Sequence, residues 1–262
     1  MFEKEITQYN ELLDTYRSYI SDRMSVEDLR QYNEVLFSAH SCAIEGNSFT
    51  VNDTRELKEK GLGLIPKGKS LFEAFEILDH FQAYEFLLSS LDKPLSEDLL
   101  KETHKLLTLH TIAYRHPGAV PGEYTDKDMA AGDTVFGQHE VLIAKVPDLL
   151  ASTQKQIDAA AIHPVIIAAR FHGFYEYLHP FRDGNGRLGR LFSNFILQKM
   201  GHPIIIIPQQ DKQAYIEALR AIRTEGTDEY LVSYFFKTAI DRMKDEISQK
   251  KKQSRPKTFI FC

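Results

Sequence analysis

Cysteine is scarce in this sequence and tryptophan is absent: the 262 residues include two cysteines. Cys42 and Cys262 lie far apart, which offers neither a disulfide framework nor the spacing of a zinc site, so a reducing compartment, the cytoplasm, is expected. Long hydrophobic runs are missing as well. The run Ile204–Pro208 is far shorter than the roughly 20 residues of a membrane-spanning helix, and the polar start Met1–Glu5 has no apolar signal segment. We therefore expect neither a membrane protein nor a secreted one.

The charge balance is weakly acidic. The formal net charge is −5 and the pI is about 6.1, which argues against a broad nucleic-acid-binding surface. Hydrophobic residues make up 43% of the chain, which is ample for a core at this length. We expect a single helical domain over residues 1–250, followed by a basic, mobile tail over residues 251–262.

Most of the chain has the pattern of helices, because apolar residues recur at three- and four-residue spacing. Ser70, with Glu73 three residues later, predicts a capping box, and Ser96 and Asp211 are further predicted N-caps. The segment Gly63–Ser70 fits the Walker A pattern, but a charged helical stretch precedes it where a buried strand is needed, so we interpret it as a loop. The expected helices are Glu5–Asp22, Val26–Ile44, Asn52–Lys60, Leu71–Leu91, Glu97–Leu109, Val146–Ala161, Pro164–Leu178, Gly186–Met200, Lys212–Arg223 and Asp228–Lys250.

One segment, Asp126–Ala144, has an extended pattern. Thr134–Phe136 and Val141–Ile143 have the alternating look of strands, and Gly137 and Gln138 lie between them, which predicts a small hairpin. The predicted fold class is therefore mainly α with one small β-hairpin.

The densest cluster of reactive side chains lies in the twelve residues His179–Arg190, between two strongly helical segments. Its Gly-Asn-Gly turn leads into a helix and presents backbone N–H groups and a positive dipole end, which together form an anion site. Arg187 and Arg190 lie three residues apart on that helix, so they reach the same anion. With His179 as a base and Asp183 as a metal-capable carboxylate, the cluster indicates phosphoryl or nucleotidyl transfer.

This segment resembles the Fic family motif, His-x-Phe-x-Asp/Glu-Gly-Asn-Gly-Arg-x-x-Arg, with every fixed position filled. Far upstream, Ser41–Gly46 resembles the inhibitory motif of the family, Ser/Thr-x-x-x-Glu-Gly/Asn. Similarity in order and spacing runs roughly from Asn33 to Tyr230. The resemblance implies a Fic-type helical bundle with an inhibitory helix over about residues 33–46, a flap over about residues 126–144 and a catalytic loop over residues 179–190.

The resemblance also implies an activity, the transfer of AMP from ATP to a Ser, Thr or Tyr hydroxyl of a target protein. His179 would take the proton from that hydroxyl, Asp183 would hold Mg²⁺ against the phosphates, and Phe181 would anchor the loop. The expected ligands are therefore ATP and Mg²⁺, and the expected partner is a protein with an accessible hydroxyl. The implied nucleotide-binding residues are Gly184, Asn185, Gly186, Arg187, Arg190 and Tyr215.

The upstream motif implies autoinhibition. Glu45 would pair with Arg190 and prevent productive seating of the γ-phosphate, because a carboxylate on a phosphate-binding guanidinium competes by charge and volume. Ser41 and Gly46 complete this motif, and Gly46 is also a good stop residue for the inhibitory helix. The resemblance therefore implies an enzyme that is quiet as isolated and is released by Glu45→Gly.

In the family the hairpin is a flap that pins the target backbone by strand addition. The residues expected to do so here are Thr134, Val135 and Phe136. Many relatives carry Tyr-Arg before the flap, where this chain has Tyr124-Thr125, so flap details and target preference stay open.

Two other functions remain as alternatives. The same fold could remove AMP from a modified protein or transfer another phosphate-containing group, with Glu45 positioning water. A non-catalytic protein that senses ATP is the third reading, although binding alone does not need His179 as a base. The family often self-associates, so a homo-oligomer is a further expectation, but the sequence assigns no patch to it.

Overall fold

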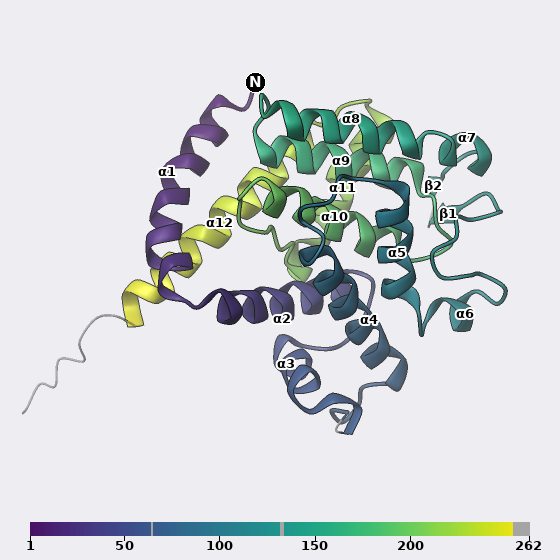
Figure 1. Ribbon diagram of the computed structural model, residues 1–262, viewed down its shortest axis with the longest axis horizontal. Helices are drawn as coiled ribbons and strands as arrows, with labels where there is room; N and C mark the ends of the chain where they lie inside the picture. The colour runs from purple at the N-terminus through teal and green to yellow at the C-terminus, as the bar shows by residue number, and fades with distance from the viewer. Residues whose placement is uncertain (64, 132–133, 254–262) are drawn as a thin grey trace, which may run out of the picture.

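The protein is helical through most of its length in the computed structural model, which describes residues 1–63, 65–131 and 134–253 (Figure 1). The helices and strands are α1 (Glu3–Tyr19), α2 (Val26–Ile44), α3 (Val51–Lys60), α4 (Leu71–Leu88), α5 (Glu97–Thr108), α6 (Ile112–Arg115), β1 (Ala130–Ala131), β2 (Thr134–Val135), α7 (His139–Ile143), α8 (Val146–Ala159), α9 (Pro164–Leu178), α10 (Asn185–Lys199), α11 (Lys212–Thr224) and α12 (Glu229–Gln253), with short 3-10 turns at Ser21–Arg23, Gly61–Gly63 and Gln209–Asp211.

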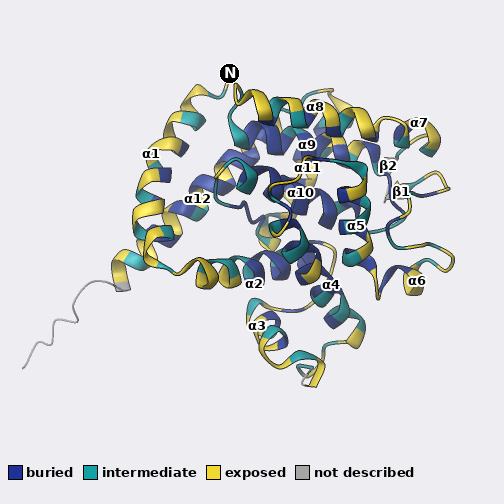
Figure 2. Cartoon of the chain, in the orientation of Figure 1, coloured by how far each residue is buried: buried dark blue, intermediate teal, exposed yellow. Residues whose placement is uncertain are grey.

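Helices α9 and α10 form the centre of the molecule. They pack against each other, and α10 also contacts α2, α4 and α5, which come from the first half of the chain (Figure 1). Every residue from Arg187 to Leu197 is buried, and the same centre is dark blue in Figure 2. Fully buried aromatic rings such as Phe171 and Phe192 fill the space between α9 and α10, and each contributes roughly 1.5–3 kcal/mol by burial. The residues at the start of α10 are thus set in a rigid core.

Two predicted helices have the bounds that the sequence indicated, Val26–Ile44 for α2 and Pro164–Leu178 for α9. The capping box of Ser70 and Glu73 is confirmed at the start of α4, and Ser96 caps α5 as predicted. The Walker A-like segment therefore ends as a helix N-cap, although Leu64 within it lies outside the described residues.

The predicted N-cap at Asp211 was wrong. Its side chain makes no cap hydrogen bond, because the backbone enters α11 from a 3-10 turn and Asp211 has φ −94° and ψ 7°. An N-cap side chain needs extended backbone at that position to reach the first turn of the helix.

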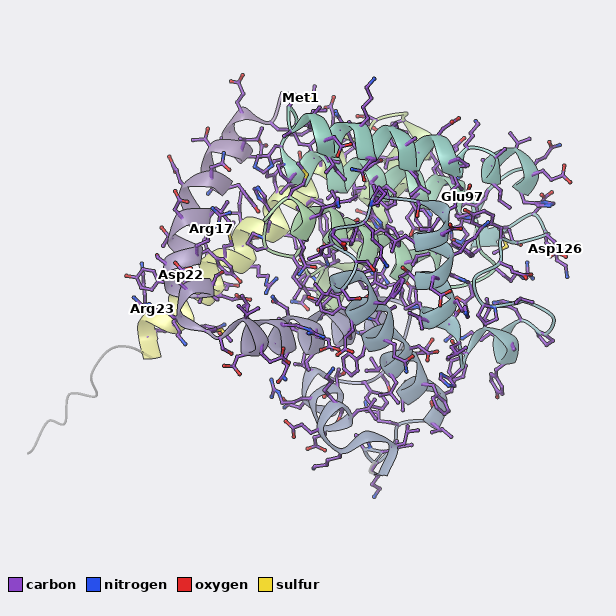
Figure 3. All side chains as sticks on the ribbon, viewed as in Figure 1. Met1, Arg17, Asp22, Arg23, Glu97 and Asp126 are labelled. Atoms are coloured by element: carbon purple, nitrogen blue, oxygen red, sulfur yellow. The ribbon has the colours of Figure 1, made fainter. Side chains whose placement is uncertain are left out.

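The hairpin predicted within Asp126–Ala144, with Thr134–Phe136 and Val141–Ile143 as its strands, was also wrong. Strands β1 and β2 pair antiparallel over two residues each, and the expected second strand is the helix α7 (His139–Ile143). An apolar run as short as Val141–Ile143 fits the periodicity of a strand and that of a helix. Here the burial of Leu142 against the core favours the helix. Residues 132–133 of the predicted flap lie outside the described residues, and Asp126 projects at the edge of the molecule (Figure 3).

The C-terminal helix is longer than predicted. Helix α12 runs to Gln253 beside α1, so residues 251–253 of the predicted tail are helical, and residues 254–262 lie outside the described residues (Figure 1). Lysines at positions 250–252 suit the last turn of a helix because its C-terminus carries partial negative charge. None of the described helices combines the length and the hydropathy that crossing a membrane requires.

Candidate active site

His179 ends α9 in the left-handed conformation, with φ 48° and ψ 56°. Histidine tolerates this region better than most side chains, and the bend turns the chain from α9 into the catalytic loop. The imidazole stacks on Phe136 with ring centroids 4.0 Å apart. Burial, assisted by the positive charge of Arg223, lowers the pKa of His179 to about 4. The ring is therefore uncharged near pH 7, the state in which it can accept a proton.

The side chain of Asn185 closes the loop. Its Oδ1 accepts from the backbone N–H of Phe181 at 3.0 Å, and its Nδ2 donates to the Phe181 carbonyl at 2.7 Å. Phe181 itself is fully buried and stacks on His104 at 3.8 Å. The Asn185 side chain thus fixes the shape of the loop from within, and its backbone is left to face a ligand.

The N-terminus of α10 is open to an anion. The helix has no side-chain cap, and its N-cap Gly184 has φ 77°, a conformation that favours glycine. A Cβ on Gly186 would lie 2.5 Å from Oε1 of Glu45 and 3.1 Å from the Arg190 guanidinium. Only glycine leaves that space free, so the loop can bring backbone N–H groups against a phosphate.

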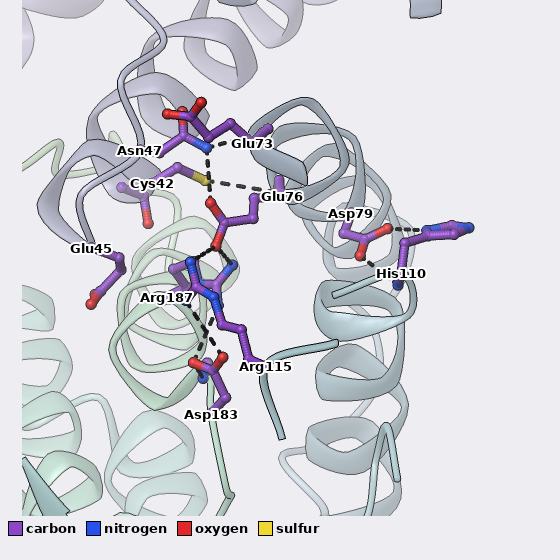
Figure 4. Close-up of polar contacts among 12 residues, drawn as sticks. Cys42, Glu45, Asn47, Glu73, Glu76, Asp79, His110, Arg115, Asp183 and Arg187 are labelled. Carbon is purple, nitrogen blue, oxygen red and sulfur yellow. Dashed lines mark hydrogen bonds and ion pairs between the residues drawn. The ribbon is translucent and has the colours of Figure 1, made fainter. Parts of the chain in front are cut away.

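Arg187 lies below this opening in the core, where its exposed fraction is 1%. Its guanidinium contacts Oε1 of Glu76 at 3.4 Å and Oδ1 of Asp183 at 3.5 Å. Glu76, on α4, also pairs with Arg115 at 2.8 Å and accepts from the Asn47 amide at 3.0 Å (Figure 4). Arg187 is therefore held by the buried carboxylate of Glu76 and by the partly exposed carboxylate of Asp183. Through Asn47, Glu76 joins Arg187 to the segment that follows α2.

Arg190 is clamped by the end of α2. Its guanidinium donates to the Ser41 hydroxyl at 3.1 Å, to the Ser41 carbonyl at 2.8 Å and to Oε1 of Glu45 at 2.7 Å. Burial pushes the pKa of Glu45 up, but the charge and hydrogen bond of Arg190 outweigh it, so the pKa lies below its ordinary value. Arg190 also donates to the hydroxyl of Tyr215 at 3.3 Å. Gly46 follows with φ 101°, which ends the helix as predicted.

Asp183 is an ionised carboxylate near the mouth of the loop. Its Oδ1 accepts from the Gly184 N–H, and its Oδ2 lies 3.5 Å from Arg115 and 3.8 Å from His116. Burial raises the pKa of Asp183, but Arg187 and Arg115 lower it further, so that it lies below its ordinary value. The carboxylate is 17% exposed and stays reachable.

A cavity of about 460 Å³ opens beside these groups. It is lined by residues of α2, α9, α10 and α11 and by Phe136. Residues of the predicted inhibitory helix, the predicted catalytic loop and the predicted flap therefore meet there. The lining includes Glu45, Glu176, His179, Gly186, Arg190 and Tyr215. The structure therefore brings the predicted base, an anion-binding turn and the predicted inhibitory carboxylate to one cavity.

The comparison with known proteins agrees with this geometry. The Fic/DOC family pattern matches residues 94–197. The chain therefore contains a domain of the Fic/DOC family over these residues.

Three known proteins are similar to this chain in sequence or in fold. It is 34% identical over 191 residues to "Protein adenylyltransferase Fic" of Drosophila willistoni, which covers 71% of this chain but 36% of that protein. A Fic domain-containing signaling protein from Bacteroides thetaiotaomicron has a TM-score of 0.80 and 25% identity over 94% of this chain and 97% of its own. A structure of IbpAFic2 in complex with adenylylated Cdc42 shares the fold, with a TM-score of 0.58 and 20% identity over 91% of this chain and 70% of its own.

Four polar residues of the Fic/DOC site were missed by the sequence reasoning. Glu76 and Arg115 belong to segments distant from the motif, and no local pattern marks them. Glu176 could have been found, because it lies three residues before His179 on the same helix. Arg223 donates to the carbonyl oxygens of Glu176 and Tyr177 at the end of α9.

Tyr215 and the predicted flap residues complete the predicted residues of the Fic/DOC site. Tyr215 lines the cavity, but its ring is 1% exposed and its hydroxyl contacts Arg190 and, at 2.6 Å, His172, so it supports the arginine. Of the predicted flap residues, Thr134 and Val135 form β2 and Phe136 stacks on His179.

Proposed function

We propose that this chain transfers AMP from ATP to a Ser, Thr or Tyr hydroxyl of a protein, and that Glu45 holds the enzyme in an inhibited state. The names of the curated relatives, protein adenylyltransferase, support the reaction, and the structure of IbpAFic2 with adenylylated Cdc42 supports a protein as the acceptor. The chain spans about a third of the length of the Drosophila relative, so the reaction is proposed for this chain from its own residues.

The observation that carries the proposal is the cavity that joins a neutral imidazole to an uncapped helix N-terminus and a buried guanidinium. Transfer of AMP needs a base for the hydroxyl proton, charge neutralisation at the α-phosphate and a bound pyrophosphate. His179 supplies the base, the Gly184–Gly186 turn the backbone donors, and Arg190 a guanidinium for the outer phosphates.

The reaction forms one bond and breaks one. The target hydroxyl oxygen bonds to the α-phosphorus of ATP as the bond from that phosphorus to pyrophosphate breaks, and the hydroxyl proton passes to His179. Pyrophosphate carries away the electron pair of the broken bond, and the arginines of α10 offset its charge. No oxidant or reductant is required.

Asp183 fits Mg²⁺ that is held mainly by the nucleotide. Mg²⁺ is usually bound through one or two carboxylates together with phosphate oxygens and water, and Asp183 is an ionised, reachable carboxylate. Bound there, Mg²⁺ would neutralise phosphate charge. Arg115 and Arg187 share the same carboxylate, so we propose that they balance its charge before the nucleotide arrives.

The proposed inhibition rests on the contact between Glu45 and Arg190. The 2.7 Å ion pair occupies the guanidinium that a γ-phosphate would use, and Glu45 Oε1 fills the space beside Gly186. We propose that removing this carboxylate frees Arg190 for ATP, with Ser41 and Gly46 as the residues that place it. Phe136, stacked on His179, is the flap residue proposed to meet the target.

The test is intact-protein mass spectrometry after incubation with MgATP, on the wild type, Glu45→Gly, His179→Ala and the double variant. We expect Glu45→Gly to gain AMP on itself or on proteins of a cell extract, at least about tenfold above the wild type. His179→Ala should remove the gain, because a general base contributes about 10²–10⁴ in rate.

The double variant separates chemistry from binding. It should bind ATP as tightly as Glu45→Gly in calorimetry and yet form no adduct. ATP binding by Glu45→Gly without any adduct on any protein would contradict AMP transfer and favour the ATP-sensing alternative, whereas loss of AMP from a pre-modified protein would favour the reverse reaction.

A further inference from the structure

The imidazole of His179, the proposed base, and the carboxyl group of Glu176 lie close together without a hydrogen bond between them. Nδ1 of His179 lies 3.7 Å from Oε2 of Glu176, and each of these side chains is about 15% exposed. Among the described residues, neither Nδ1 of His179 nor Oε1 of Glu176, the other oxygen of the same carboxyl group, has a hydrogen-bond partner, and both atoms are buried. A buried polar atom left unpaired costs about 1–3 kcal/mol, so this arrangement needs an explanation.

The backbone around the pair is rigid. Glu176 lies in the last turn of α9 and His179 is the C-cap of that helix, three positions later, which places the two side chains 3.7 Å apart. Arg223 donates to the Glu176 and Tyr177 carbonyl oxygens, which fixes that end of the helix. The absence of a side chain at Gly189 makes room for the carboxyl group, since a Cβ there would lie 3.1 Å from Glu176 Oε1.

The two guanidinium groups whose charges act on Glu176 contact other residues. Arg190 pairs with Glu45, and the Arg223 guanidinium stacks on Phe136 and Tyr177 besides its carbonyl contacts. The Glu176 carboxyl group therefore lines the cavity next to the imidazole, and no guanidinium in the described part of the chain is bound to it.

We propose that Glu176 is the positioning residue of His179, and that its carboxylate accepts a hydrogen bond from the Nδ1–H of His179 when ATP and the target are bound. Closing the gap from 3.7 Å to a hydrogen bond needs a shift of less than about 1 Å, and contacts of catalytic side chains are often this long before the substrates arrive. This role rests on the proposed function of His179 as the base.

The contact would do two things for the reaction. It fixes the tautomer that carries hydrogen on Nδ1, which leaves Nε2 as the nitrogen that takes the hydroxyl proton. It also stabilises the imidazolium that forms, as the buried carboxylate of a serine-protease triad does. Glu176 itself neither touches the phosphates nor changes its bonds.

The charge state of the pair gives the proposal a pH signature. Burial raises the pKa of Glu176 to about 7, against the opposing charge of Arg190, and Glu45 and Arg223 are the other charged groups that face it. Since the ionised form is the better partner for Nδ1–H, the rate should rise with pH through about 7 and level off above it.

The experiment uses the full chain in the Glu45→Gly background, because this is the variant expected to transfer AMP. Glu176→Gln keeps the volume and removes the charge, Glu176→Asp keeps the charge and shortens the reach, and Glu102→Gln on the surface of α5 is the matched control. We expect kcat to fall about 10- to 100-fold in Glu176→Gln with KM for ATP nearly unchanged, and the rise in rate near pH 7 to disappear. Glu176→Asp should recover part of kcat and keep the pH dependence.

A second readout does not depend on AMP transfer. Histidine C–H resonances followed by NMR, and assigned with His179→Ala, should show the midpoint of the His179 titration about one pH unit lower in Glu176→Gln than in the parent. Thermal unfolding of each variant serves as the folding check.

The outcomes separate this inference from the proposed function. Wild-type kcat and an unchanged pH profile in Glu176→Gln would overturn the role of Glu176 and leave AMP transfer standing. If no variant transfers AMP, the reaction is contradicted, and an unaltered His179 titration in Glu176→Gln would overturn the contact as well. A lowered titration midpoint without AMP transfer would support the contact alone.

Discussion

The two arginines of α10 make the same kind of bond in different surroundings. Arg187 contacts Glu76 with both side chains 1–2% exposed, while Arg190 contacts Glu45, whose side chain is 35% exposed. In Figure 4 Glu76 is surrounded by polar partners and Glu45 stands apart from that group. A carboxylate in the core cannot be exchanged for a ligand at small cost, whereas one at the edge of a cavity can. The first pair is therefore structural, and the second is suited to regulation.

The largest expected effect concerns the Arg187–Glu76 pair and is a loss in the free energy of unfolding. Glu76→Ala leaves the Arg187 guanidinium buried beside a single remaining carboxylate, and breaking a buried pair in this way costs about 3–5 kcal/mol. Glu85→Ala, on the same helix, removes only a half-exposed partner of Lys58 and Arg30 and should cost less than about 1 kcal/mol. Urea unfolding of both variants checks this, and equal losses would contradict the comparison.

The second effect concerns ATP. Glu45→Gln removes the negative charge at Arg190 while keeping the shape of the side chain, so ATP should bind about tenfold more tightly, which is about 1.4 kcal/mol. Titration calorimetry measures this, with Glu102→Gln as the control that should leave the affinity unchanged. An affinity equal to that of the wild type would mean that Glu45 and the γ-phosphate do not compete.

A smaller effect should follow pH. The pKa of Glu45 is lower in the folded state than its ordinary value near 4.5. The ionised carboxylate therefore stabilises the fold at pH values above 4.5, and this contribution is lost as the pH falls through the lower pKa of the folded state. The stability difference between the wild type and Glu45→Gln should thus be constant from pH 7 to about 5 and shrink below 4.5. Urea unfolding at several pH values tests this, and a difference that grows on acidification would have the wrong sign.

The smallest effect is that of salt. The Glu45–Arg190 pair is partly open to solvent, so raising NaCl from about 0.05 to 0.5 M should weaken it and raise the residual AMP transfer of the wild type a few-fold. Glu45→Gly has no such pair, and its rate should not rise with salt. A parallel rise in both proteins would point to a general salt effect on ATP or target binding.

Local signals in the sequence account for much of the fold. The bounds of α2 and α9, and the capping box of Ser70, follow from apolar periodicity and from side chains that bond within one turn. The predicted hairpin failed at α7, because an apolar run of three residues fits strand and helix alike until Leu142 is buried on the core. Asp211 failed as a cap for a related reason, since the turn before it set the backbone.

The candidate site shows the same division between what local sequence predicts and what packing decides. The motif placed His179, Asp183 and both arginines correctly on one loop and helix, because they are near in sequence. Asn185 and Tyr215 were both expected among the nucleotide-binding residues. In the structure the Asn185 side chain bonds within the loop, and the Tyr215 hydroxyl accepts a hydrogen bond from Arg190. Which partner a polar side chain takes depends on what packs around it.

The sequence alone therefore indicated the residues of the motif, the helices that flank them and the proposed inhibitory role of Glu45. The tertiary structure forms the contact between Glu45 and Arg190 that the resemblance implied, across 145 positions of chain. Only the tertiary structure decided that Glu76 pairs with Arg115 and Arg187, and that the Glu176 carboxylate lies 3.7 Å from His179. Backbone hydrogen bonds and caps act over a few residues, whereas the pairing of buried charges follows from the helices that meet at α10.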